Sequence, residues 1–76
     1  MKPVFKELKK IGSIEISDTS KLRFTIISIN KDKCVNIRKF IETEDYTGYT
    51  KQGVIVRQEN LGRFHKLLHK AIKEVE

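Results

Sequence analysis

Cationic and aromatic side chains are concentrated in residues 33–56, and they are the groups of this chain best suited to hold an anion. The first part of this stretch reads KCVNIRKFI, an apolar and β-branched run that also carries cations. Tyr46 and Tyr49 follow, in a segment that contains Gly48 and Gly53. Single-stranded nucleic acids are held by cations that follow the phosphates and by flat rings that accept the bases. This stretch is therefore the candidate binding surface.

The composition limits what the chain can be. Its 76 residues make one domain, and so short a chain buries only about 60% of the surface that its unfolded form exposes. The single cysteine, Cys34, excludes an internal disulfide, so a second copy of the chain is the expected source of further buried surface. Sixteen Lys and Arg against ten Asp and Glu give a net charge of +6, which favours an anionic partner.

Hydropathy and cysteine usage predict an intracellular protein without a membrane partner. No apolar run approaches the roughly 20 residues that cross a bilayer, and the start of the chain lacks the apolar core of a secretory signal. A lone cysteine in an apolar run fits a reducing compartment. We expect a cytoplasmic protein, associated with the nucleoid in a bacterium or nuclear in a eukaryote.

Alternating apolar and polar residues predict the strands of a sheet. Residues 14–16 alternate as a short strand. Residues 22–29 form a longer strand in which Leu22, Phe24 and Ile26 share one face and the odd-numbered residues share the other. Because both faces are partly apolar, we expect this strand in the interior of the sheet.

A hairpin turn is expected at residues 30–33, so the strands on either side should be antiparallel neighbours. In the second of these strands, Asn36 and Arg38 share a face. Phe40 and Ile41 are adjacent and both apolar, which breaks the alternation and predicts a bulge or a bend just before them.

The remainder of the chain predicts a long loop at residues 42–52, a strand at residues 54–56 and a helix from about Asn60 to the end. In the helix, apolar residues recur at steps of three and four and form one stripe: Leu61, Phe64, Leu68, Ala71, Ile72 and Val75. Cations recur about half a turn away. One face is therefore expected to pack, and the other to meet water or an anion.

The first ten residues are rich in lysine and have apolar residues at a spacing compatible with a helix. Isolated helices shorter than roughly 12 to 15 residues rarely persist in water. Residues 1–10 are thus expected to be either a short helix docked on the domain or a mobile basic arm. The binding domain proper then covers residues 11–76.

Catalytic and metal sites are not expected. His65 and His69 lie four residues apart on the predicted helix, but the glutamate of a zinc-peptidase motif is missing between them. The carboxylates of the predicted loop have no histidine or phosphate cradle nearby in the sequence. Cys34 is best explained as a packed thiol. We predict no enzyme activity and no cofactor.

A family resemblance rests on two motifs. Residues 35–40 read VNIRKF and residues 45–53 read DYTGYTKQG, followed by a strand and a helix. On these motifs the chain resembles the positive cofactor four family of transcriptional coactivators, above all its compact bacterial members, over roughly residues 11–73. The resemblance implies an α+β fold, in which a four-stranded, strongly curved antiparallel sheet precedes one amphipathic helix that pairs with its twin in a two-fold homodimer.

The resemblance also implies a function, which is sequence-tolerant binding of single-stranded DNA or melted duplex in transcription, replication or repair. It implies the transcription or repair machinery as further partners. Family-type binding positions are matched by Lys21, Arg23, Lys31, Lys33, Arg38 and Lys51. At two positions where members of the family carry a stacking aromatic residue, this chain has Asn30 and Ile41 instead. The complete predicted interface adds Lys39 and the candidate stacking residues Phe40, Tyr46 and Tyr49, and the predicted dimer contact consists of Leu61, Phe64, Leu68 and Ile72.

Two other functions remain open, an RNA-binding module and a dimerisation or protein-interaction domain that binds no nucleic acid. The predicted binding residues also have structural interpretations. The tyrosines can pack within the loop through their hydroxyls, and Arg38 can pair with Glu42 or Glu44. Lys31 and Lys33 can keep the edge of a hairpin soluble.

Overall fold

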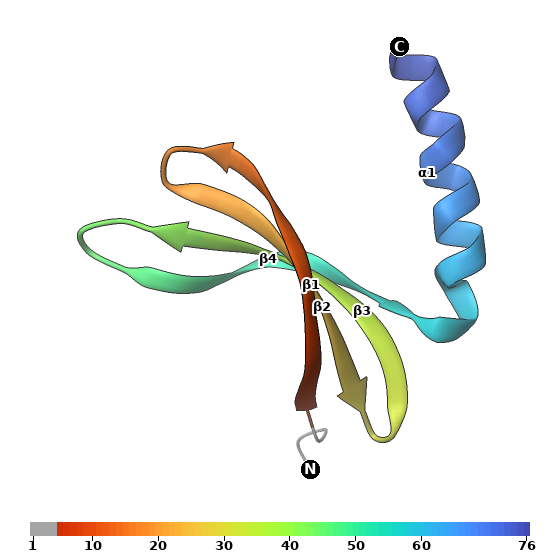
Figure 1. Cartoon of the computed structure of the whole chain (residues 1–76), viewed down its shortest axis with the longest axis horizontal. Coiled ribbons are helices and arrows are strands. Elements are labelled where there is room, and N and C mark those ends of the chain that lie inside the picture. Colours follow the sequence, from red (N-terminus) through yellow and green to blue (C-terminus); the bar gives the residue numbers. More distant parts are fainter. Residues whose placement is uncertain (1–4) are drawn as a thin grey trace.

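The computed structural model describes residues 5–76, which form a four-stranded sheet and one C-terminal helix. The strands are β1 (Phe5–Ser17), β2 (Ser20–Ile29), β3 (Asp32–Glu42) and β4 (Thr47–Arg57), and a 3-10 turn, η1 (Gln58–Asn60), leads into α1 (Leu61–Val75). Neighbouring strands are antiparallel and follow the order of the chain. Figure 1 shows a twisted sheet with α1 standing to one side of it. The predicted α+β class is confirmed.

β1 starts earlier than the sequence predicted. Residues 5–10 pair with β2, with Lys10 opposite Thr25, so neither a helix nor a mobile arm describes them; residues 1–4 of that segment lie outside the described residues. Register shifts after Glu7 and after Lys10 interrupt the strand's alternation. Because each shift displaces the apolar positions by one residue, the spacing imitates that of a helix.

The connection between β3 and β4 is shorter than the predicted loop. β3 continues to Glu42 and β4 begins at Thr47. Thr43 closes the turn, since its backbone N–H donates to the Tyr46 carbonyl at 2.8 Å and its hydroxyl accepts the Tyr46 N–H at 3.0 Å. Most of the residues expected in a loop therefore belong to strands.

An irregularity interrupts the pairing of β3 with β4 at the position predicted for a bend. Arg38 lies opposite Gly53 and Phe40 lies opposite Tyr49, so the extra residues belong to β4. β3 keeps a continuous register with β2 throughout. Phe40 and its apolar neighbour Ile41 consequently point to opposite faces of the sheet.

The core of the chain is small. Ile27, Ile29 and Cys34 form its buried cluster, with Ile55 packed against it, and Val56 is buried elsewhere in the sheet. No residue of α1 is buried. The sheet therefore carries the packing of the single chain, and the apolar stripe of the helix adds almost nothing to it.

Gly53 allows β4 to approach β3 closely, and a methyl group there should destabilise the sheet. A Cβ at Gly53 would lie 2.6 Å from the Ile37 carbonyl oxygen and 2.9 Å from the Arg38 Cα. We expect Gly53→Ala to lower the free energy of unfolding by about 1 to 3 kcal/mol, measured by urea denaturation at fixed protein concentration.

The matched control is Gly62→Ala, because a Cβ at Gly62 meets no atom within 4 Å apart from its chain neighbours and the nearby backbone of its own helix. Alanine should leave the stability of that helical position unchanged or raise it by up to about 1 kcal/mol. Equal stability of the Gly53→Ala variant and the parent chain would contradict the close approach.

Candidate nucleic-acid interface

β2 and β3 present two chemically different faces, as the alternation of the sequence predicted. One face, here called the arginine face, holds the cross-strand pairs Lys21–Phe40, Arg23–Arg38, Thr25–Asn36 and Ile27–Cys34. The opposite face holds the pairs Leu22–Lys39, Phe24–Ile37 and Ile26–Val35. The arginine face thus changes along its length from charged and aromatic, through polar, to buried and apolar.

Five side chains at the charged end of this face form what we call the arginine–aromatic cluster: Lys21, Arg23, Arg38, Phe40 and Tyr49. The Arg23 guanidinium lies over the Phe40 ring, with its Cζ 3.8 Å from the ring centroid. The Phe40 and Tyr49 rings meet edge to face, with centroids 5.3 Å apart and planes at 82°. Lys21 Nζ is 5.5 Å from the Phe40 centroid. All five side chains are half-buried.

In the described part of the chain, no carboxylate pairs with either of the two arginines of the cluster. Arg23 and Arg38 lie directly opposite each other, and among residues 5–76 neither forms an ion pair. The Nε of Arg38 is buried and has no hydrogen-bond partner. Like charges at directly opposite positions destabilise a sheet, and a buried donor without an acceptor has lost its water. Both features favour an anion at this place.

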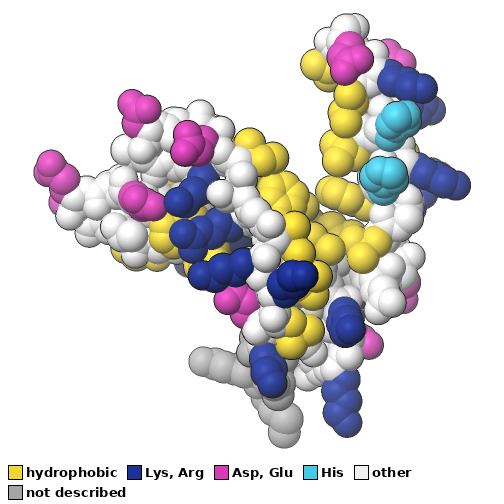
Figure 2. Space-filling model, viewed as in Figure 1, with side chains coloured by type: hydrophobic (Ala, Val, Ile, Leu, Met, Phe, Trp, Pro, Cys, Tyr) yellow, Lys and Arg dark blue, Asp and Glu magenta, His cyan; other side chains and the backbone are white. Residues whose placement is uncertain are grey.

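Acidic side chains limit the cluster at the end of the sheet nearest the β1–β2 turn. Lys21 pairs with Glu42, with 3.2 Å between Nζ and Oε1, so Glu42 does not neutralise Arg38. A hollow of about 230 Å³ next to Phe40 is lined by Glu15, Ser17, Asp18, Thr19, Ser20, Lys21, Phe40 and Glu42. Figure 2 shows Lys and Arg side chains gathered beside hydrophobic ones, with acidic side chains toward the β1–β2 and β3–β4 turns. A phosphate would be attracted to the arginines and repelled from the acidic β1–β2 and β3–β4 turns.

β1 adds a cation that the sequence did not indicate. Lys10 lies opposite Thr25 and Ser13 opposite Arg23, and residues directly opposite in an antiparallel pair share a face. A shallow hollow of about 170 Å³ beside Arg23 is lined by Lys10, Gly12, Ser13, Arg23, Phe24 and Thr25. Since only the pairing of β1 with β2 brings Lys10 here, no local motif could have identified it.

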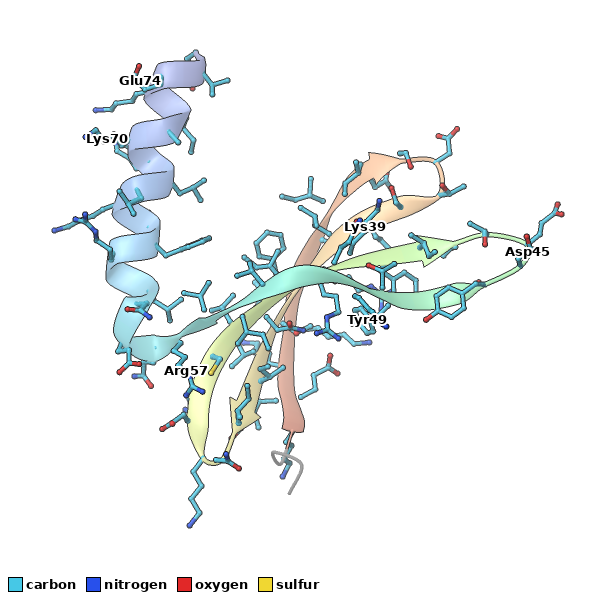
Figure 3. All side chains as sticks on the ribbon, turned by 180° about the vertical axis from the view of Figure 1, so that it is seen from behind. Lys39, Asp45, Tyr49, Arg57, Lys70 and Glu74 are labelled. Carbon is cyan, nitrogen blue, oxygen red and sulfur yellow. The ribbon has the colours of Figure 1, made fainter. Side chains whose placement is uncertain are left out.

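The other predicted cations lie away from the cluster. Lys31 belongs to the β2–β3 turn at the far end of the sheet, with a φ of 75°, and Lys33 lies opposite Ser28 on the opposite face. Lys39 and Tyr49 point to opposite sides of the sheet (Figure 3). Lys51 is exposed in the irregular part of β4. The structure brings together only part of the predicted set.

Tyr46 contributes to the β3–β4 turn. Its hydroxyl donates a hydrogen bond to the Tyr49 carbonyl at 2.6 Å, as the loop-packing interpretation of this tyrosine requires. Its side chain remains half exposed. Tyr49 differs, because its ring contacts Phe40 within the cluster.

The geometry of the cluster is the basis for assigning a function. Comparisons with protein-family models, curated proteins and solved structures found no match to this chain. In the described part of the chain, His, Cys, Asp and Glu side chains do not gather in groups of three that could hold a metal ion. Cys34 is buried. No helix within residues 5–76 is both long enough and apolar enough to span a bilayer.

Replacing Arg38 with an apolar residue of similar length should not destabilise the protein. Arg38→Met removes the repulsion from Arg23 together with a buried, unpaired donor. We expect the free energy of unfolding to rise by up to about 1 kcal/mol at low salt, and the gain to shrink as salt screens the charges.

Urea denaturation of the parent protein and of Arg38→Met, at equal protein concentration and at two salt concentrations, measures this difference in the free energy of unfolding. Arg57→Met is the matched control, because Arg57 is paired with Asp32 at 3.6 Å and its loss should bring no gain. If the free energy of unfolding falls by more than about 1 kcal/mol in Arg38→Met, Arg38 stabilises the fold, and its repulsion from Arg23 is not a net cost to stability.

Proposed function

We propose that this protein binds single-stranded nucleic acid, DNA in the first place, through the arginine–aromatic cluster and without chemistry. The observation that carries the proposal is the cross-strand pair of Arg23 and Arg38, which lacks a carboxylate partner within residues 5–76 and adjoins the Phe40–Tyr49 ring pair. Phosphates neutralise such a pair, and unpaired bases stack on such rings. Resemblance to the positive cofactor four family supports DNA as the ligand, and transcription, replication or repair as the setting.

In this proposal, cations on neighbouring strands of the sheet bind the phosphates of the nucleic acid. Arg38, Arg23 and Lys10 occupy β3, β2 and β1 in turn on the arginine face, so a strand crossing the sheet meets one cation after another. Neutralising about three phosphates of a single strand gives a slope near −2 for log K against log salt. Lys21 contributes less, because Glu42 already holds it.

A curved sheet would turn the arginine face into a groove. Thr25, Ile27 and Cys34 on that face are almost completely buried, although α1 leaves none of its own residues buried. A sheet bent toward the arginine face would account for the way its own side chains cover one another. Such a bend would also bring cations of different strands toward one ligand.

A fluorescence-anisotropy titration of labelled oligo-dT, with a duplex of equal length as competitor, tests the function. We expect preference for the single strand and a salt slope near −2. The Arg23→Ala/Arg38→Met variant should bind at least about tenfold more weakly, with the slope reduced by about 1.4 for the two lost phosphates. Oligo-U in place of oligo-dT tests the RNA alternative.

The matched control is Lys66→Ala/Lys70→Ala, which removes the same charge from α1; Lys70 points away from the sheet (Figure 3). Its affinity should change by less than about twofold. Equal binding of single strand and duplex, or equal binding by the cluster variant and its control, would contradict the proposed function. The chain would then be better explained as a protein-interaction domain.

The proposed active unit is a homodimer that buries the apolar stripe of α1. Phe64, Leu68 and Ile72 of this stripe are between 37% and 49% exposed, and Leu67, which is not part of it, is 50% exposed. Hydrophobic side chains line the side of α1 that faces the sheet, and further ones lie across from it on the sheet (Figure 2). A second copy carries the same stripe, so the two stripes are complementary by symmetry.

Leu68→Asp should disrupt this dimer, because it places a charge in the middle of the stripe. We expect sedimentation equilibrium to show a monomer, or circular dichroism to show unfolding, since a core this small couples folding to association. Lys70→Asp carries the same new side chain on the polar side of α1 and should remain a folded dimer. A folded, unchanged dimer of Leu68→Asp would contradict the interface.

A further inference from the structure

The Phe40 ring, the flat surface most central to the cluster, is covered in the free protein. The Arg23 guanidinium lies over it, with the Cζ at 3.8 Å from the ring centroid. A guanidinium is planar and weakly hydrated, and it stacks on aromatic rings as a nucleobase does. Arg23 therefore occupies a place over Phe40 that a base needs for stacking.

Neither of the other two cluster residues beside Phe40, Tyr49 and Lys21, substitutes for this contact. Tyr49 meets Phe40 at 82°, which is an edge contact and not a stack. Lys21 Nζ is farther away, at 5.5 Å from the centroid, and is paired with Glu42. Arg23, by contrast, forms no ion pair within residues 5–76. Its hold on the ring is a cation–π contact that a competing stacking partner can replace.

We propose that Arg23 is a placeholder for a nucleobase: an unpaired base takes its position over Phe40, and the displaced guanidinium moves to a phosphate of the same strand. The inference rests on the proposed function and names the residue that decides where a base stacks. Two forces drive the exchange. Arg38, directly opposite, repels Arg23, and the arriving phosphates attract it.

If the exchange takes place, Arg23 has two opposite effects on binding, which would not be so if it only bound a phosphate. Arg23 opposes base stacking and supports phosphate binding at the same time, so its removal should change the two contributions in opposite directions. A strand without bases can meet the N–H groups at the edge of the Arg23 guanidinium with its phosphates, but it has no group to take the place over Phe40, so the guanidinium stays on the ring. Oligo-dT and an abasic oligodeoxyribose phosphate of equal length therefore separate the two contributions.

Proton NMR of the intact protein observes the exchange directly. In the free protein, the ring current of Phe40 should shift the Arg23 side-chain protons upfield. Addition of oligo-dT should abolish this shift, whereas the abasic strand should leave it largely in place. An unchanged Arg23 shift with bound oligo-dT overturns the inference, and so does equal release by the abasic strand.

Two single variants test the same inference by affinity. Arg23→Ala should raise the ratio of abasic to oligo-dT dissociation constants about two- to fivefold, because a cation–π contact no longer competes with the base. Phe40→Leu should bring that ratio close to one. Lys70→Ala, which removes one charge from α1, should leave the ratio unchanged. A ratio that falls or stays constant in Arg23→Ala overturns the inference, even where Phe40→Leu fails to fold.

Failure of the inference is distinguishable from failure of the proposed function. When anisotropy shows binding of oligo-dT that weakens in the Arg23→Ala/Arg38→Met variant, but the Arg23 protons keep their ring-current shift, single-strand binding stands and the placeholder is refuted. When oligo-dT produces neither an anisotropy change nor any NMR shift, both are refuted.

Discussion

Repulsion between Arg23 and Arg38, held opposite each other on β2 and β3, is the interaction on which the proposed interface depends. Within residues 5–76 neither side chain has a carboxylate partner, and Arg38 also keeps its buried Nε unpaired. Folding gains from the cation–π contact of Arg23 with Phe40, but not from holding the two arginines opposite each other. An anion along the arginine face would remove the repulsion and provide the missing acceptor for the Arg38 Nε. The opposed arginines therefore account for two expectations, which are that Arg38→Met is no less stable than the parent protein and that the ligand is an anion.

The surrounding structure holds this pair in place by backbone geometry. β2 and β3 keep an uninterrupted register, so both arginines share a face. Gly53, which has no side chain to clash with Arg38, lets β4 approach at that point, and the irregularity beyond it sets Tyr49 against Phe40. Beyond the arginines, the buried Asn36 amide donates to the Thr25 hydroxyl at 3.3 Å. The cluster is thus supported by β3 and by both of its neighbouring strands.

The sequence predicted those parts of the structure that depend on local alternation. The faces of residues 22–29, the hairpin between β2 and β3, and the C-terminal helix could all be read from spacing. Residues 5–10 could not, because their strand is stabilised by pairing with β2 and is irregular enough to imitate a helix. The place of Lys10 beside Arg23, in the proposed interface, was missed for the same reason. The partner of Glu42, which is Lys21 and not Arg38, likewise follows only from the register.

The most direct test is to map the binding surface residue by residue, with amide chemical shifts of isotopically labelled protein during titration with oligo-dT. The largest shifts are expected at Lys10, Arg23, Arg38, Phe40 and Tyr49, and none on the Lys66–Lys70 side of α1. Shifts confined to the opposite face or to α1, or spread evenly over all lysines, would contradict an interface built on the opposed arginines.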